Sequence, residues 1–300
     1  MTLNARGTAP RLRAEGAVGR RQAVSRLSRW VLLLATLAGV AALAVLAVEV
    51  ISSGGSSLSW GFVTHYPSRF AERAGLRSSI LGTFWLMLAT IAIAVPVSIG
   101  AAVWLEEFAP RNRVTGIVRL NIANLAGVPS IIYGILGLAI FVRLLGLGPS
   151  ILAGALTLSL MIIPMTVIAA SEAIRQVPSS MRDASLALGA TRWQTVWHHV
   201  LPGALPGIMT GAILSVSRAA GETAALIMIG AFAFIAFDNK GIDVLGQEFT
   251  TVPIQVYNWT IRPQVEFRAL AAAGIIVLMV GVLALNLIAV LLRERFRRTW

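Results

Sequence analysis

Two ionisable residues inside an apolar segment are the chain's most unusual chemical feature. Arg218 and Glu222 stand four residues apart within the segment 206–237, a spacing that places both side chains on one face of a helix. An arginine deep in a membrane is costly unless something compensates its charge. Two roles are open: an intrahelical ion pair that stabilises a bundle, or a guanidinium in an aqueous path that binds an oxyanion through two hydrogen bonds. In the second role, Glu222 holds the guanidinium while the path is empty.

Patterns typical of catalytic and metal sites are absent from the sequence. The chain has no cysteine, which excludes disulfides and thiolate zinc sites. It has three histidines, of which His198 and His199 are adjacent, a poor spacing for metal ligands. It also lacks the G-x-x-x-x-G-K-[ST] loop that binds nucleotide phosphates and the G-x-S-x-G motif of hydrolases. We therefore expect no catalytic residue, no metal and no bound cofactor.

The composition predicts a helical membrane protein that would position these residues. Of 300 residues, 57% are hydrophobic and 13% are charged, whereas soluble domains have about a quarter charged residues. At roughly 20 apolar residues for each crossing, the sequence predicts six transmembrane helices. The predicted spans are 30–51, 80–105, 117–145, 150–170, 206–237 and 269–292.

Arginines flank the apolar region at both ends of the chain. Seven precede residue 30 and four follow residue 292, in a chain of net charge +12. With six spans, sixteen Lys and Arg residues fall on the side of the two tails and six on the other. This asymmetry predicts a multi-pass protein of the cell inner (cytoplasmic) membrane with both termini in the cytoplasm. We expect the tails 1–29 and 293–300 to contact the phospholipid bilayer rather than nucleic acid, and 1–29 to be disordered.

The segments 117–145 and 206–237 are longer than one crossing needs, and each contains glycine or proline. A kink or a break is therefore expected in both. Small residues recur four apart in both, a spacing that lets helix backbones approach closely. The pairs and series are Ala123 with Gly127, Ser130 with Gly134, Gly207 with Gly211 and Ser215, and Ser217 with Gly221.

Charged residues near the ends of other spans receive simpler interpretations. Glu106 and Glu107, with two following arginines, are expected to form a solvated turn. Arg119 is expected to extend towards the membrane interface, as long basic side chains do. Glu172 is either a helix-end residue or a partner contact.

The loop 171–205 is far longer than usual helix connections and is predicted to contain two short helices. The first follows Pro178, and Gly189 ends it. The second begins at a capping box of Thr191 and Gln194 and ends at Pro202. One face of the first helix is predicted to carry Met181, Ala184, Ser185 and Leu188. Such helices either dock in a groove of a partner or lie on the lipid surface.

The stretch DASLALGATRWQTVWHHVLP, residues 183–202, resembles the EAA loop of ABC importer membrane subunits. The pattern of that loop is EAA, three residues, Gly, then nine residues before I-x-L-P. Residues Asp183, Ala184, Gly189, Leu201 and Pro202 align with it. Asp183 replaces Glu, Ser185 replaces the second Ala, and His199 replaces the apolar residue. The resemblance implies that the first short helix is the coupling helix, which docks on a cytoplasmic ATPase subunit.

Two further stretches resemble signature segments of the permease subunits of phosphate-specific (Pst-type) ABC importers. They are NLAGVPSIIYG, residues 124–134, and SRAAGETAAL, residues 217–226. The chain is more similar to the A-type subunit, and the resemblance covers about 79–292. It implies an all-α, type I (MetI-like) permease domain over 30–292. The motif positions carried over are Asn124, Gly127, Pro129, Ser130, Gly221, Leu201 and Pro202.

The resemblance implies a transport subunit and not an enzyme. The chain would form half of an alternating-access pathway for inorganic phosphate with a homologous C-type permease subunit. An ATPase dimer that binds ATP and Mg and an external phosphate-binding protein would complete the importer. This reading favours the pathway role for Arg218. The alternatives are a permease for another oxyanion or small solute and, more distantly, a membrane scaffold that regulates a phosphate sensor.

Overall fold

The computed structural model describes residues 17–232, 234–239, 241 and 243–295. Within them the protein is all-α, with one isolated β-bridge and no strand. The chain divides into two compact units, 1–49 and 50–300. Most of helix α1 (Ala17–Gly54) belongs to the first unit. The expectation of disorder over 1–29 falls partly outside the described residues, but 17–29 are helical, because arginine, alanine and leucine favour helix and no proline lies in this stretch.

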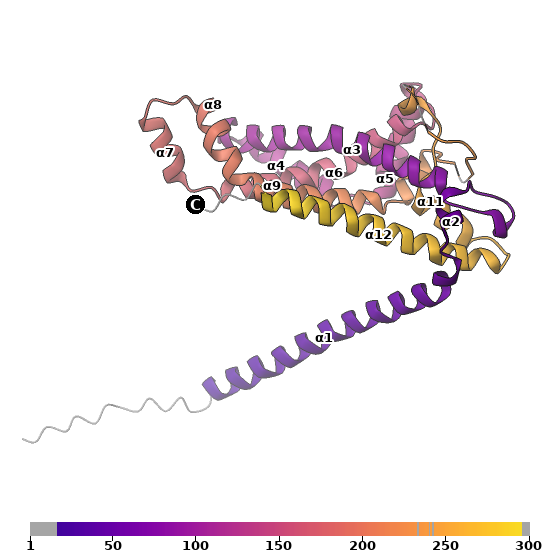
Figure 1. Cartoon of the computed structure of the whole chain (residues 1–300). Coiled ribbons are helices and arrows are strands. Elements are labelled where there is room, and N and C mark those ends of the chain that lie inside the picture. The colour runs from indigo at the N-terminus through magenta and orange to yellow at the C-terminus, as the bar shows by residue number, and fades with distance from the viewer. Residues whose placement is uncertain (1–16, 233, 240, 242, 296–300) are drawn as a thin grey trace, which may run out of the picture. The chain divides into compact units, whose positions relative to one another are not determined.

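The second unit contains the remaining helices (Figure 1). In the described part of the chain, five helices are long and apolar enough to cross a membrane, and one bent pair supplies a sixth crossing if it counts as one span. The all-α membrane fold predicted from composition is therefore confirmed. The elements from residue 50 onward are η1 (Gly55–Ser57), α2 (Trp60–Thr64), η2 (Ala71–Arg73), α3 (Arg77–Val103), η3 (Trp104–Phe108), α4 (Arg113–Ala126), α5 (Ser130–Gly137), η4 (Leu138–Leu144), α6 (Ile151–Arg175), α7 (Ser179–Ala187), α8 (Arg192–Thr195), η5 (Val196–Val200), α9 (Leu201–Ala220), α10 (Ala224–Met228), η6 (Val244–Gly246), α11 (Val252–Thr260) and α12 (Glu266–Arg295).

The third predicted span is broken, as expected from its length and composition. Helices α4 and α5 meet at an angle of 101° across residues 127–129, which we call the elbow. Pro129 has no N–H to continue α4 and disfavours helical geometry in Val128 before it. Across the elbow, the hydroxyl of Tyr133 donates a hydrogen bond to the carbonyl oxygen of Leu125 at 2.8 Å. The bend therefore keeps one of the last carbonyls of α4 satisfied.

The fifth predicted span, 206–237, is wrong at both ends. The second short helix does not end at Pro202, because α8, the π-helical turn η5 and α9 join into one helix from Arg192 to Ala220. Proline is tolerated at this join because it lies in the first turn of α9, where a missing N–H breaks no α-type hydrogen bond. At the other end, Gly221 caps α9, and after the short α10 no helix is found among the described residues of 229–243.

The segment after α10 runs through the bundle rather than forming a span. The fully buried Ser78 hydroxyl of α3 donates to the carbonyl oxygen of Ile235 at 2.7 Å. Arg77 forms a bidentate ion pair with Asp238, with N–O distances of 2.8 and 2.7 Å. Trp85 donates to the carbonyl oxygen of Asn239 at 3.1 Å. Side chains in the first half of α3 thus bind carbonyl oxygens and a carboxylate of this segment, whose described residues form no helix.

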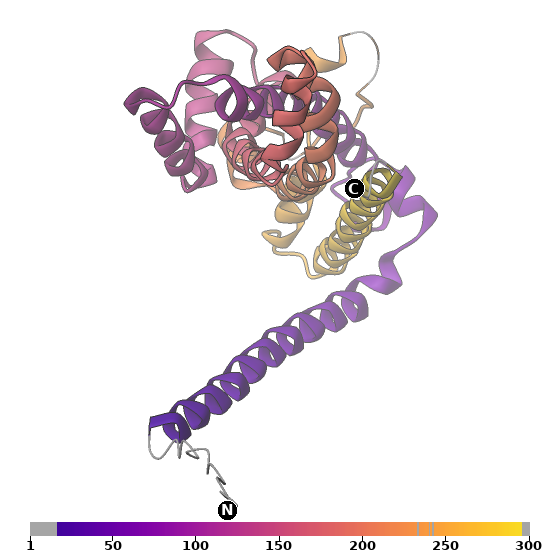
Figure 2. The same ribbon diagram turned by 90° about the vertical axis from the view of Figure 1, so that its left-hand side faces the viewer.

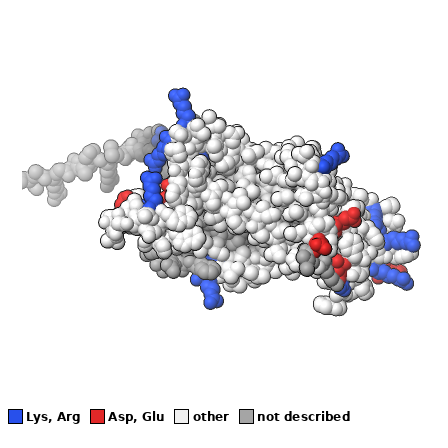
Figure 3. All heavy atoms as spheres, turned by 90° about the horizontal axis from the view of Figure 1, so that it is seen from above, with Lys and Arg blue, Asp and Glu red and all other residues white. Residues whose placement is uncertain are grey.

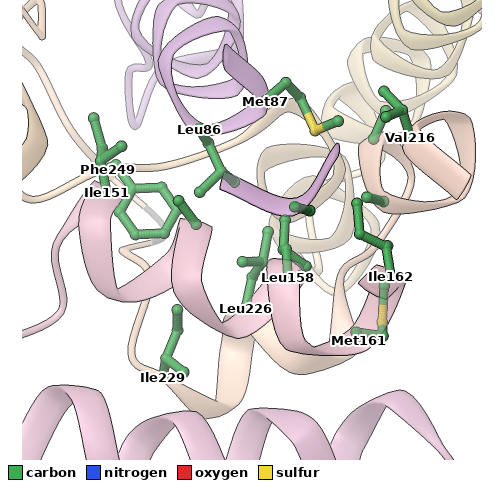
Figure 4. Packing of buried hydrophobic residues seen from close by; sticks show 14 of the residues in the cluster. Leu86, Met87, Ile151, Leu158, Met161, Ile162, Val216, Leu226, Ile229 and Phe249 are labelled. Carbon is green, nitrogen blue, oxygen red and sulfur yellow. The ribbon is translucent and has the colours of Figure 1, made fainter. Parts of the chain in front are cut away.

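Helix α6 lies at the centre of the second unit, between α3 and α9. Its side chains Ile151, Leu158 and Ile162 are fully buried. Figure 4 shows them packed with Leu86 of α3 and with residues that follow α9. Seen from the α7–α8 end in Figure 2, α4 and α12 lie on opposite sides of this centre. On the face in Figure 3, charged residues gather towards the two ends and leave an uncharged band between them.

Glycines of α9 set its close approach to α6, as the small-residue spacing predicts. A Cβ at position 207 would lie 2.7 Å from the Ala173 methyl carbon, and one at position 211 would overlap the Ala169 methyl group. Ala169 and Ala173 are themselves four apart on α6. The helices therefore pack along two facing stripes of small residues.

We predict that Gly211→Val forces α9 away from α6 and destabilises the purified protein by about 1–3 kcal/mol, the usual cost of overpacking. The measurement is the thermal unfolding of the protein in detergent. Gly100→Val of α3 is the matched control, because a Cβ at position 100 meets nothing within 4 Å. Equal unfolding temperatures for the two variants would contradict the close approach.

Candidate functional site

The first short helix of the long loop is α7, and it has the boundaries that the sequence predicts. Pro178 precedes its first turn, and Gly189 follows it with a φ of +86°, a conformation suited to glycine. Leu188 at its end is 89% exposed. The whole Leu188 side chain is therefore accessible to a partner or to lipid.

The predicted face of α7 divides between the surface and the bundle. Asp183 and Ala184 are exposed with Leu188 and Gly189. Ser185 is buried, and its hydroxyl lies 2.9 Å from the hydroxyl of Thr195 on α8. Met181 is half-buried and packs against the core between α6 and α9. The exposed part is therefore smaller than the predicted face, since Ser185 serves the contact between α7 and α8.

Helix α8 begins with the predicted capping box. The backbone N–H of Gln194 donates to the Thr191 hydroxyl at 3.3 Å, and the backbone N–H of Thr191 donates to the Gln194 side-chain oxygen at 2.8 Å. Beyond the cap, the exposed rings of Trp193 and Trp197 stack with centroids 5.9 Å apart. Phe108 of η3 extends the stack, at 6.1 Å from Trp193. The aromatic stack thus joins the start of this helix to the end of α3.

Glu106 and Glu107 do not form the solvated turn expected from the sequence. Their side chains are 9% and 12% exposed, and both are paired with arginines from distant elements. Arg182 of α7 donates to Glu107 at 2.7 and 3.0 Å. Arg175 donates to both oxygens of Glu106 at 2.9 and 3.0 Å, and Arg119 of α4 binds the same carboxylate. The expectation that Arg119 extends to the interface is also wrong, because Glu106 holds it.

The predicted pairing of Arg218 and Glu222 is not formed. Helix α9 ends at Ala220, so the two residues do not share a helix face. No ion pair joins these two described residues; instead a Glu222 carboxylate oxygen accepts hydrogen bonds from the N–H groups of Ala224 and Ala225 at 3.1 and 3.3 Å. Glu222 thereby caps the short helix α10. Capping uses one oxygen of the carboxylate, and the charge has no counter-ion among the residues that the structure describes.

Arg218 is exposed near the end of α9. Its guanidinium donates to the thioether sulfur of Met165 on α6 at 3.1 Å. A thioether is a weak acceptor and carries no charge. The other N–H groups of this guanidinium are therefore available to an acceptor that approaches from the exposed side.

The two signature segments lie together at the two helix breaks. Gly127, Pro129 and Ser130 occupy or border the elbow, and the exposed Asn124 lies just before it. Gly221 separates α9 from α10. The segments meet where α5 packs on α10, since a Cβ at position 134 would lie 2.7 Å from the Ala225 carbonyl oxygen. The remaining motif positions, Leu201 and Pro202, lie at the join of η5 and α9.

Residues 94–298 match a family model described as the binding-protein-dependent transport system inner membrane component. The chain is 35% identical to the probable ABC transporter permease protein YqgI of Bacillus subtilis, over 80% of this chain and 85% of that protein. It is 30% identical to the phosphate transport system permease protein PstA of Xylella fastidiosa, over 93% and 96%. PstA 1 of Mycobacterium tuberculosis H37Rv is also 30% identical, over 76% and 71%.

Solved structures share the fold at low sequence identity. The chain superposes on a bacterial alginate ABC transporter in complex with an alginate-bound periplasmic protein with a TM-score of 0.63 and 16% identity, over 92% of this chain and 98% of that one. The MetNI methionine ABC transporter in an inward-facing conformation gives a TM-score of 0.57 and 18% identity, over 75% and 95%.

The capping role of Glu222 predicts different effects for two substitutions. Glu222→Gln keeps the accepting oxygen and should leave α10 intact, whereas Glu222→Ala removes both hydrogen bonds and should destabilise α10 by about 1 kcal/mol. The measurement is amide hydrogen exchange of Ala224 and Ala225, with Leu86 in α3 as an internal reference. Equally fast exchange in both variants would show that the charge, rather than the accepting oxygen, holds α10.

Proposed function

We propose that this chain, which belongs to the family of binding-protein-dependent transport system inner membrane components, imports inorganic phosphate. It would do so as an ABC importer permease subunit, the role that its family membership gives it. The cargo rests on one observation above all. The guanidinium of Arg218, which forms no ion pair among the described residues, lies within SRAAGETAAL, one of the two segments similar to those of phosphate-specific permeases. PstA proteins of several bacteria, about 30% identical over most of this chain, support the same cargo.

Arg218 suits a phosphate oxyanion for physical reasons. Its planar fork can donate two parallel hydrogen bonds to a tetrahedral anion. It stands 16 residues beyond Pro202, roughly 24 Å along the helix at 1.5 Å per residue. In this position it would meet the anion within the membrane, where a charged contact is least weakened by water. Glu222, held by the N–H groups of α10, stays aligned beside the path rather than neutralising Arg218.

The movement of the ATPase dimer on closing would be transmitted to the transport pathway through α7. In this proposal, α7 docks by Leu188, Ala184 and Asp183 in a groove of a cytoplasmic ATPase subunit that binds ATP and Mg. A second, homologous permease subunit completes the pathway, and an external phosphate-binding protein delivers the anion. Each nucleotide state must bind the inward-open and outward-open forms with different free energies for the transport cycle to advance.

The experiment is uptake of labelled phosphate at micromolar concentration by cells that lack other phosphate importers, with and without this chain. Unlabelled phosphate, sulfate, molybdate and a phosphonate serve as competitors. Loss of uptake without the chain, with competition by phosphate alone, supports the proposal. Competition by another oxyanion would reassign the cargo, and unchanged uptake would favour the scaffold role.

Arg218→Lys is predicted to lower uptake roughly tenfold or more, because lysine cannot form the bidentate contact. Copurification of the ATPase subunit should not change. Arg143→Lys is the control, since Arg143 is also an exposed arginine of an apolar segment but lies on η4. Normal uptake by the Arg218 variant would contradict the bidentate role.

Leu188→Asp is predicted to abolish copurification of the ATPase, because it places a charge in an apolar contact. The matched control is Trp60→Asp in α2, which removes another highly exposed apolar side chain, 82% exposed, from an element outside the loop. The measurement is the ATPase retained per permease on affinity purification. Full retention by the Leu188 variant would place the docking surface elsewhere.

A further inference from the structure

Arg182 fastens α7 to two other helices. Besides its three hydrogen bonds to Glu107 of η3, its guanidinium donates to the carbonyl oxygens of Val177 at 2.6 Å and Ile174 at 2.9 Å, near the end of α6. The side chains of Arg182 and Glu107 are 22% and 12% exposed. An ion pair this shielded, in which two N–H groups converge on one carboxylate oxygen, is directional. Any displacement of α7 therefore pulls on η3.

Glu106, next to Glu107 on η3, continues the connection to α4. It accepts from Arg175 at the end of α6 and from Arg119 in the middle of α4. Beside these ion pairs a pocket of about 110 Å³ is lined by both arginines, Glu172 and apolar side chains of η3, α4 and α6. Apolar side chains of α3, α4 and α6 pack next to it, so Glu106 adds a directional contact to helices that already touch.

Beyond α4 the connection reaches the exposed arginine. Helix α4 ends at the elbow, and α5 on the other side packs on α10 at Gly134. Helix α10 directly follows the break that holds Gly221 and Glu222 after Arg218. Two helices that meet at a bend can move as a hinge. A shift of α4 would therefore rotate α5. The order of contacts is thus α7, η3, α4, the elbow, α5 and α10.

We propose that Glu106 and Glu107 form an acidic joint through which movement of α7 reaches the elbow and the anion pathway. This proposal rests on the proposed ATPase-driven function. It assigns the transmission of the α7 movement to two residues outside the loop 171–205. Without the joint, α7 would still dock on the ATPase and move, whereas α4 would no longer follow. The two glutamates hold α7 and α4 in a fixed relation to η3 and do not touch the transported anion.

The test measures whether α7 and α4 move together. The chain has no cysteine, so pairs of spin labels can be attached to introduced cysteines of the purified permease, which is then assembled into the complete importer in nanodiscs. One pair joins the exposed positions 187 on α7 and 287 on α12, and the other joins 114 on α4 and 287. The distance in each pair is compared between the nucleotide-free complex and the complex trapped with ATP and vanadate.

In the parent chain, both distances should change on trapping. In the Glu106→Gln, Glu107→Gln variant, the 187–287 change should remain while the 114–287 change is lost, and phosphate transported per ATP hydrolysed should fall roughly tenfold. Glu172→Gln is the matched control, since this carboxylate is 58% exposed and its one ion pair within the described residues is with Arg175 of its own helix. It should retain both changes. A 114–287 change that persists in the double variant would overturn the acidic joint.

A charge exchange separates transmission from simple loss of structure. Arg182→Glu combined with Glu107→Arg restores an ion pair of opposite polarity and should recover both distance changes and at least part of the transport. If the double glutamine variant loses both changes and the exchange does not restore them, the acidic joint is wrong. Absence of any nucleotide-dependent change in the parent importer would contradict the ATPase-driven function itself.

Discussion

Every backbone N–H and C=O in apolar surroundings must find a partner within the protein, and this requirement decides where the helices can break. At the elbow, the Tyr133 hydroxyl binds the carbonyl oxygen of Leu125. After α9, Glu222 accepts from the first N–H groups of α10. Each break thus carries its own side-chain partner. Breaks satisfied in this way can border a pathway, because they expose polar groups without leaving the backbone unpaired.

The charged residues at the α7 end obey the same requirement for partners within the protein. The shielded carboxylates Glu106 and Glu107 would be costly to withdraw from water alone, and each is paired with partly exposed arginines from other helices. Removing one member of such a set costs more than the set contributes, because the remaining charge loses its partner. The ion pairs therefore do more to fix which helices stay together than to raise total stability. The fixed arrangement is what a transmission between distant parts of the protein requires.

The sequence predicted features whose causes lie within a few residues of each other. The ends of α7 follow from Pro178 and Gly189, and the capping box follows from Thr191 and Gln194. It failed where partners are distant. The segment 229–243 is apolar enough to suggest a helix, but its hydrogen-bond partners lie on α3, more than 150 residues earlier. Glu107 and Arg182 are separated by 75 residues, and no local pattern indicates that pair.

The contacts of residues 235, 238 and 239 with α3 have a consequence for biosynthesis. Ser78 is fully buried, yet the carbonyl oxygen that accepts from its hydroxyl belongs to Ile235, which the ribosome makes 157 residues later. Arg77 and Trp85 also wait for partners from this late stretch. Helix α3 therefore enters the membrane with these groups still served by water or by insertion machinery. Folding of the bundle is completed only when the last third of the chain has been synthesised. Its residues then replace water or insertion machinery as the hydrogen-bond partners of α3.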